Sequence, residues 1–284
     1  MILGSFQNGG KHLMKLSIIT VNLNNKGGLV RTVESVLSQS FKDFEYIIID
    51  GGSRDGSKQI IQEASSRFPA MIWLSEPDSG VFNAMNKGVH LAKGDYFLFL
   101  NSGDFLVDND VLARVFAKEY TDDILLGIAR VTKQGKTVWK AYPKKEYTLN
   151  NLYHGSLAHQ AAFIKKDLFN RFGDYREDLR FMSDWEFFLR TLILNRCSLS
   201  PLDIVICDYN IEGISSDKSN SAAIAQERQS VYLDLGLDRI VPDYAERDRW
   251  KDDHKALLWA WRNPVLHRLI SFLYRFANKR NSVS

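Results

Sequence analysis

Short apolar runs alternate with amphipathic segments along residues 16–104. The runs are rich in β-branched residues and almost free of polar positions, which is typical of strands covered on both faces of a parallel sheet. The segments between them place apolar residues at helical spacing. This alternation predicts an α/β fold in which helices flank a mostly parallel, Rossmann-like sheet. The expected strands are LSIITV, FEYIIID, MIWLS and DYFLFL, and the expected helices are LVRTVESVLSQS, SKQIIQEASSRF and GVFNAMNKGVHLA.

Residues 105–216 have a less regular pattern. Two apolar runs on either side of residues 133–135, which have the turn-like sequence KQG, predict a β-hairpin. The runs HQAAFIKK and LDIVICDYN predict two further strands. Between them, SDWEFFLRTLILNR has the apolar spacing of a helix and carries Asp184 and Glu186 near its start.

Residues 217–284 are expected to form a C-terminal helical extension of a different character. After Asp253 the sequence contains no acidic residue but six basic ones. Asn263 and Pro264 are a good helix start, because Asn is a strong N-cap and Pro is tolerated at the first helical position. A basic, aromatic, amphipathic helix fits an anionic membrane surface, but the same stripe would also suit packing on the main domain or on a second subunit. The stripe comprises Val265, Leu266, Leu269, Ile270, Leu273 and Phe276, with Trp259, Trp261 and Tyr274 as further aromatic residues.

Composition narrows the class of protein. The 284 residues are 45% hydrophobic and 25% charged, as in ordinary globular proteins, and a net charge of +3 is too small to indicate nucleic-acid binding. Cys197 and Cys207 lack the spacing of a zinc site, and so few cysteines favour reduced thiols in the cytoplasm. Residues 1–14 lack the apolar core of a secretion signal and are expected to be a flexible lead-in. A peripheral position on the inner face of the cytoplasmic membrane and a homodimer both stay open.

Acidic and small polar residues follow the expected strands at the point where each strand ends. In open α/β sheets ligands bind beyond the carboxyl ends of the strands, so these segments should meet at one edge. Carboxylates repel a bare diphosphate unless a divalent cation lies between them, and Asp104 suits that role for Mg²⁺ or Mn²⁺. The strand ends are Thr20-Val21-Asn22, Asp50-Gly51-Gly52-Ser53, Glu76-Pro77-Asp78 and Asn101-Ser102-Gly103-Asp104.

Missing motifs exclude several classes of enzyme. The first strand is not followed by G-x-G-x-x-G, which disfavours a dinucleotide dehydrogenase. A phosphate-binding loop of the G-x-x-x-x-G-K-[ST] type is absent, and so is the G-x-S-x-G turn of serine hydrolases. A nucleoside diphosphate with a metal ion remains the ligand that best explains the acidic edge.

Four successive segments resemble the motifs of glycosyltransferase family 2: SIITVNLNN, IIIDGGSRDGS, NAMNKGVHLAKGDYFLFLNSGD and SDWEFFLR. The resemblance covers roughly residues 16–216 and is greatest to bacterial enzymes of capsule, exopolysaccharide and O-antigen synthesis. It implies a GT-A catalytic domain over residues 15–216, with a nucleotide-binding half at 15–104 and an acceptor half at 105–216. It further implies an inverting, metal-dependent transferase. Such an enzyme moves a hexosyl or N-acetylhexosaminyl group from a nucleotide sugar, with UDP as the default nucleotide, to a saccharide or lipid-linked oligosaccharide.

The resemblance also implies roles for individual residues. Asp184 matches the family's catalytic base, and Asp104 stands in its metal-binding motif, where Asn101 and Gly103 replace residues that are often acidic. Leu23 stands where the family often has a tyrosine that stacks on the base. The other implied contacts are Thr20 and Asn22 in the nucleotide pocket, Asp50 at the base or ribose, Asp78 beside the nucleoside, and His159 near the diphosphate or acceptor. Asn101 and Ser102 are expected as supporting polar groups beside Asp104. The loop EGISSDKSNS could close over the donor, with Ser215, Ser216 or Lys218 reaching the phosphates.

The residues leave alternatives open. Asp184 could instead cap its helix, because acidic residues are common in a first helical turn, and Glu186 is the fallback base. The depleted metal motif leaves room for a nucleotide-sugar-binding protein without transfer activity. A sugar nucleotidyltransferase also places a metal at a sheet edge, but NLNNKGG matches its triphosphate-binding loop poorly.

Overall fold

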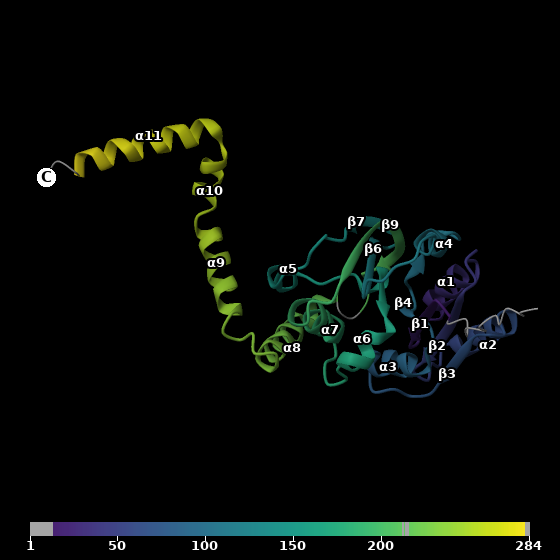
Figure 1. Ribbon diagram of the computed structural model, residues 1–284. Coiled ribbons are helices and arrows are strands. Elements are labelled where there is room, and N and C mark those ends of the chain that lie inside the picture. Colours follow the sequence, from purple (N-terminus) through teal and green to yellow (C-terminus); the bar gives the residue numbers. More distant parts are fainter. Residues whose placement is uncertain (1–13, 212, 214–215, 282–284) are drawn as a thin grey trace, which may run out of the picture. The chain divides into compact units, whose positions relative to one another are not determined.

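The computed structural model describes residues 14–211, 213 and 216–281 (Figure 1). The expected lead-in, apart from Met14, and the candidate Ser215 lie outside these residues. The chain divides into two compact units, one that ends at Val231 and one that begins at Tyr232. The first unit contains a mixed sheet whose first strands are parallel and flanked by helices, so the α/β class expected from the sequence is confirmed.

The first half of this unit builds the parallel part of the sheet. Its elements are β1 (Leu16–Asn22), α1 (Lys26–Leu37), β2 (Phe44–Asp50), α2 (Ser57–Arg67), β3 (Ile72–Ser75), α3 (Val81–Leu91) and β4 (Tyr96–Phe99). β1 and β2 are buried along their whole length, as near-continuous apolar strands require. Parallel pairing places Asn22 opposite Asp50, and Asp50 opposite Ser75. Three polar side chains therefore share one edge of the sheet.

The second half extends the same sheet with strands of mixed direction. Its elements are β5 (Phe105–Leu106), α4 (Val111–Val115), β6 (Ile124–Lys133), β7 (Lys136–Ala141), α5 (Leu149–His154), the 3-10 helix η1 (His159–Ala161), β8 (Ala162–Lys165), α6 (Lys166–Phe172), α7 (Ser183–Phe188), the π-helix η2 (Leu189–Leu194) and β9 (Leu199–Asn210). In the described part of the chain the strand order is β3-β2-β1-β4-β8-β6-β9-β5, and the predicted hairpin adds β7 beside β6. The helix expected from residue 183 changes from α7 to a π-helical turn at Leu189.

The C-terminal part is helical, as expected. Its elements are the 3-10 helix η4 (Lys218–Asn220), α8 (Ser221–Asp234), α9 (Val241–Asp253), α10 (Lys255–Arg262) and α11 (Pro264–Asn281). The Oδ1 atom of Asn263 accepts hydrogen bonds from the backbone N–H groups of Val265 (3.1 Å) and Leu266 (3.3 Å), which confirms the predicted N-cap. Every helix in the described residues is too short or too polar to span a bilayer.

Candidate active site

A polar network around Asp50 joins the carboxyl ends of three neighbouring strands. Asp50 is fully buried, and its Oδ1 accepts hydrogen bonds from Asn22 Nδ2 (2.8 Å) and Ser53 Oγ (2.6 Å). Its Oδ2 accepts from the Ser53 backbone N–H (3.0 Å) and the Ser75 hydroxyl (2.8 Å). Burial opposes ionisation of this carboxyl group, but the hydrogen bonds outweigh it and hold the pKa of Asp50 below its usual value. The protein thus fills all the acceptor positions of this carboxylate.

Thr20 and Asn22 lie near the end of β1 and differ in their surroundings. Thr20 is fully buried, and its hydroxyl donates to the Leu100 carbonyl (2.7 Å) and meets the Tyr46 hydroxyl (3.1 Å). Asn22 uses its amide group to hold Asp50, whereas its buried Oδ1 has no partner among the described residues. Of the two, only Asn22 keeps an unused acceptor, because the Thr20 hydroxyl is engaged with Leu100 and Tyr46.

Gly51 brings two further candidate residues close to the strand end. A Cβ atom on Gly51 would lie only 2.5 Å from Asp78 Oδ2 and 3.3 Å from Leu23 Cδ1, so glycine is needed for both side chains to lie this close. Asp78 accepts a hydrogen bond from the Gly80 N–H (3.0 Å), and Leu23 is 56% exposed. Leu23 therefore presents an apolar surface beside a carboxylate at this edge.

Helix α1 fixes the turn that follows β4. Asn25 Nδ2 donates to the Ser102 carbonyl (2.8 Å). The Thr32 hydroxyl donates to the Asp104 carbonyl (2.6 Å) and accepts from the Gly103 N–H (3.0 Å). Gly103 has a φ of 109°, a conformation that residues with a Cβ atom rarely adopt. The segment is therefore a firmly held turn at the strand end.

Asp104 ends this turn with a buried carboxyl group that is only 5% exposed. Burial raises the pKa of Asp104 to about 7, against the opposing effects of a hydrogen bond from the Asn210 N–H (2.9 Å), the nearby His159 and the Gln160 side chain. Unlike Asp50, this carboxylate keeps acceptor capacity that the described residues leave unfilled. A cation beside Asp104 would stabilise its charged form.

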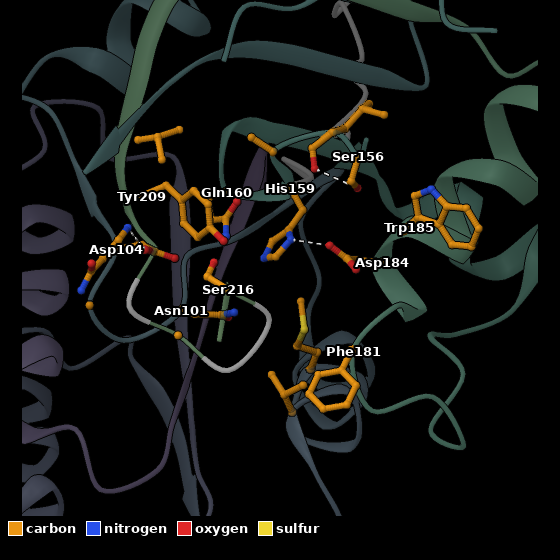
Figure 2. Close-up of a pocket in the computed structure, with 18 of the residues that line it drawn as sticks. Asn101, Asp104, Ser156, His159, Gln160, Phe181, Asp184, Trp185, Tyr209 and Ser216 are labelled. Atoms are coloured by element: carbon orange, nitrogen blue, oxygen red, sulfur yellow. Dashed lines mark hydrogen bonds and ion pairs between the residues drawn. The ribbon is translucent and has the colours of Figure 1, made fainter. Parts of the chain in front are cut away.

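His159 and Asp184 form a hydrogen-bonded pair. The Nδ1 atom of His159 lies 2.8 Å from Oδ2 of Asp184, and their side chains are 14% and 16% exposed (Figure 2). Because an ionised carboxylate can only accept, Nδ1 is the donor of this hydrogen bond, and in a neutral imidazole Nε2 is then the acceptor. Nε2 is buried without a partner in the described part of the chain. The pair therefore offers a carboxylate oxygen and an imidazole nitrogen to a ligand.

Helix α7 positions Asp184 without using it as a cap. The carboxylate of Glu227 on α8 accepts hydrogen bonds from the three backbone N–H groups of residues 180–182 at 2.8, 2.9 and 3.1 Å. A carboxylate at this end also interacts favourably with the helix dipole. Asp184 turns its own carboxylate to His159. The capping alternative for Asp184 is therefore not the arrangement that this structure contains.

Glu186, the fallback base, is occupied elsewhere. It is 2% exposed, and its two oxygens accept from Arg190 Nε (2.9 Å) and Nη2 (3.0 Å). A buried bidentate pair of this kind fixes both side chains. Glu186 does not line the cavity that Asp184 lines.

A cavity of about 530 Å³ gathers one group of the candidate residues (Figure 2). The candidates that line it are Asn101, Ser102, Asp104, His159 and Asp184, together with Ser216 beside the candidate Ser215. The candidates that do not line it are Thr20, Asn22, Asp50 and Asp78, which belong to the strand ends described above. The residues expected at the metal and at the reacting atoms thus line one cavity. The residues expected at the nucleoside lie outside it, at the strand ends.

Sequence reasoning missed several residues of this cavity. Gln160, Arg180 and Tyr209 line it, and so does Trp139, which lies on β7 and is 51% exposed. Gln160 could have been found as the neighbour of His159 in HQAAF. Trp139 and Tyr209 carry no motif, and only the pairing of β7 and β9 with β6 brings them to the cavity.

The cavity contains donor atoms of the kinds that bind a divalent cation. Asn101 Oδ1 and His159 Nε2 are buried without partners among the described residues, and Asp104 has unfilled acceptor capacity. Oxygen ligands suit both Mg²⁺ and Mn²⁺, whereas an imidazole nitrogen favours Mn²⁺ of the two. The described residues contain no metal-type cluster of three His, Cys, Asp or Glu side chains. Several ligands would therefore come from a bound diphosphate and water.

Comparisons with known proteins identify relatives of this chain. The profile of the family described as Glycosyl transferase family 2 matches residues 17–176. An uncharacterized glycosyltransferase of Mycobacterium tuberculosis is 31% identical over 228 residues, which cover 75% of this chain and 82% of that protein.

Two solved structures share the fold. S. aureus TarS in complex with UDP-GlcNAc aligns with a TM-score of 0.54 at 22% identity, and the match covers 69% of this chain but only 58% of that one. Mannosyltransferase PcManGT from Pyrobaculum calidifontis, in complex with GDP-Man and Mn²⁺, aligns with a TM-score of 0.56 at 13% identity over 93% of this chain and 80% of that one. The expected GT-A fold is thereby confirmed. The chain belongs to glycosyl transferase family 2.

Proposed function

We propose that this chain is an inverting glycosyltransferase of surface polysaccharide or glycolipid synthesis. It would move a hexosyl or N-acetylhexosaminyl group from a nucleoside diphosphate sugar, with a UDP-sugar as the first choice, to a hydroxyl of a saccharide or lipid-linked saccharide. The observation that carries the proposal is a single cavity that holds both the Asp184–His159 pair and the Asp104 turn. The pair supplies a proton acceptor for the attacking hydroxyl, and the turn supplies a carboxyl group that can hold a cation beside the leaving diphosphate.

The donor nucleoside would lie along the strand-end edge. The unpartnered Oδ1 of Asn22 offers an acceptor to the ribose or base, and Asp50 holds Asn22 in that orientation. Asp78 and the exposed Leu23 lie against Gly51 and would flank the nucleoside. The complexes of TarS with UDP-GlcNAc and of PcManGT with GDP-Man support a nucleoside diphosphate sugar as the donor.

A divalent cation, Mn²⁺ or Mg²⁺, would be held by Asp104, with Asn101 and His159 as further donors. When bound, it supplies positive charge that stabilises the departing nucleoside diphosphate. The Mn²⁺ in the PcManGT complex supports a divalent cation alongside the donor, and not these particular ligands. The chain's own contribution is to keep the Asp104 carboxylate in place, through the hydrogen bonds of α1 to the turn and of the Asn210 N–H to the side chain.

Asp184 is the proposed general base. His159 holds its Oδ2, so the other carboxylate oxygen can take the proton from the acceptor hydroxyl as that oxygen attacks. A single displacement of this kind inverts the anomeric configuration. In this scheme His159 positions Asp184 through Nδ1 and keeps Nε2 as a donor to the cation. Ser215 stays a predicted phosphate contact.

The acceptor would enter beside the β6–β7 hairpin. Trp139 offers a half-exposed indole on the cavity wall, and a flat aromatic face suits the apolar face of a pyranose ring. A saccharide acceptor therefore fits this wall better than a small hydroxyl compound would.

The test is a donor screen with the purified full-length chain and Mn²⁺ or Mg²⁺. Release of nucleoside diphosphate from one of a panel of UDP-, GDP- and dTDP-sugars is expected. Asp184→Asn should lower that rate by about 10³-fold while donor binding, followed by thermal shift, survives. The matched control is Asp178→Asn, because Asp178 is exposed and does not line the cavity.

Three results would contradict the proposal. Release of pyrophosphate would indicate a nucleotidyltransferase, and donor binding without any release would indicate a nucleotide-sugar-binding protein. Wild-type turnover by Asp184→Asn would remove Asp184 from the role of base.

A further inference from the structure

The C-terminal helices present a large apolar surface to solvent. Seven large apolar side chains within residues 257–273 are more than half exposed: Leu257, Trp259, Trp261, Val265, Leu269, Phe272 and Leu273. Single exposed apolar residues are common on protein surfaces, but a run of this density marks an interaction site.

On α11 the apolar and polar side chains separate into two faces. At 3.6 residues per turn, Val265, Leu269 and Leu273 follow one another along one face. Ser271 lies on the opposite face, about 200° around the helix from Leu269, whereas Arg268, three residues after Val265, flanks the edge of the apolar stripe. The Asn263 cap fixes where this helix begins.

The two helices α10 and α11 are joined at one residue. The Asn263 N–H donates to the Trp259 carbonyl (3.2 Å) at the end of α10, while its side chain caps α11. The rings of Trp261 and His267 lie 4.3 Å apart across the junction. Exposed tryptophans thus sit close to the start of the apolar stripe.

The charge of this segment is of one sign. The sequence after Asp253 contains six Lys and Arg residues and no acid. Lys255 pairs with Asp252 (2.8 Å), whereas Arg262 and Arg268 have no acidic partner in the part of the chain that the structure describes. A second copy on this surface would bring like charges together, so the charge favours an anionic occupant.

We propose that α10 and α11 lie in the plane of an anionic lipid bilayer. The stripe of Val265, Leu269 and Leu273 inserts among the acyl chains, the tryptophans sit at the interface, and Arg262 and Arg268 reach the lipid phosphates. This attachment goes beyond the proposed function and is independent of it, because a chain without transferase activity would still bind the bilayer.

The test is co-sedimentation of the full-length chain with lipid vesicles at low salt. The chain should pellet with vesicles made of equal parts of phosphatidylcholine and phosphatidylglycerol and stay mostly in the supernatant with phosphatidylcholine alone. One basic residue near the surface contributes about fivefold in affinity, so Arg262→Gln with Arg268→Gln should weaken binding about 25-fold.

A matched pair of variants separates apolar insertion from charge. Leu269→Glu and Ser271→Glu add the same charge within one turn of α11, but only Leu269 belongs to the apolar stripe. Leu269→Glu should weaken vesicle binding about a hundredfold and Ser271→Glu about fivefold. Leu269 is 52% exposed, so circular dichroism of the variant should match the wild type.

Several outcomes would overturn the proposal. A wild-type chain that stays in the supernatant with phosphatidylglycerol vesicles would do so, and equal losses for Leu269→Glu and Ser271→Glu would do so too. Light scattering that shows a dimer, converted to monomer by Leu269→Glu, would assign the stripe to a second copy of the chain.

Discussion

Asp50 and Asp104 are both buried aspartates at or just after the ends of parallel strands, yet their surroundings differ. Around Asp50, hydrogen bonds from Asn22, Ser53 and Ser75 fill the carboxylate and outweigh the effect of burial on its pKa. Around Asp104 burial dominates and raises the pKa to about 7. One carboxylate belongs to a closed polar network and the other to an open cavity. Both carboxylates lie at strand ends, so position alone does not distinguish the structural role of Asp50 from the ligand-binding role proposed for Asp104. The number of acceptor positions that the protein leaves unfilled does distinguish them.

Asp104→Asn tests the open side of this comparison and should have the largest effect. We expect kcat to fall about 10³-fold, because an amide cannot replace the anionic group that the metal–diphosphate needs. The free energy of unfolding should change by less than about 1 kcal/mol, since the new Oδ1 can still accept the Asn210 N–H. Donor turnover with Mn²⁺ and urea unfolding measure the two quantities. Retained turnover would mean that Asp104 serves the fold alone.

Asp50→Asn tests the closed side and is the matched counterpart. Its amide group would face the donors of Asn22, Ser53 or Ser75, so at least one buried hydrogen bond would be lost. We expect the free energy of unfolding to fall by about 3 kcal/mol. Urea unfolding at neutral pH gives the value. An equal loss in Asp104→Asn would erase the distinction between the two carboxylates.

The low pKa of Asp50 makes the loss of stability in Asp50→Asn depend on pH. Because the pKa of the folded state lies below the ordinary value of 3.8, the ionised group stabilises the fold above that pH. This stability is lost as the pH falls through the folded-state pKa. The difference in unfolding free energy between the wild type and Asp50→Asn should therefore be constant above about pH 5 and shrink below about pH 4. Urea unfolding across this range would show it, and a difference that persists in acid would mean that the charge is not the source.

The alternation of apolar runs predicted the parallel half of the fold well, because strands buried on both faces must be apolar throughout. The N-cap at Asn263 was equally readable, since capping is a local interaction. The π-helical turn η2 and the place of β9 between β6 and β5 were not, because both depend on packing between distant segments.

For the candidate site, too, local features could be predicted from the sequence and contacts between distant segments could not. Asp104, His159 and Asp184 were named from motifs, and one cavity contains all three. Their contacts were not predictable: the bond between His159 and Asp184 joins residues 25 positions apart. Glu227, which holds the start of α7, comes from a helix with no motif at all. Roles that rest on one local segment can be read from a sequence, whereas roles that need two segments require the fold.

Trp139 lies on the apolar wall of the cavity that contains Asp104 and allows a test of ligand contact by an uncharged side chain. If exposed surface there marks ligand contact, Trp139→Ala should raise the KM for the saccharide acceptor about tenfold, through loss of ring stacking, and leave the KM for the donor unchanged. Val138 is the matched control, because it is also about half exposed, lies on the other face of β7 and does not line the cavity. A similar change in both KM values, or an equal effect of Val138→Ala, would contradict a stacking role.

Asn25 links the start of α1 to the turn at Ser102 and allows the smallest and most selective test. Its Oδ1 caps α1 by accepting the Gly28 N–H (3.1 Å), and its Nδ2 holds the Ser102 carbonyl (2.8 Å). Asn25→Asp keeps the cap and loses the second bond, whereas Asn25→Ala loses both. If the position of the turn affects donor binding, both variants should raise the KM for the donor by about fivefold. The free energy of unfolding of Asn25→Ala should be about 1 kcal/mol lower than that of Asn25→Asp, because only Asn25→Ala loses the cap. A KM that instead follows the stability of each variant would mean that the Ser102 turn serves the fold, as the network around Asp50 does.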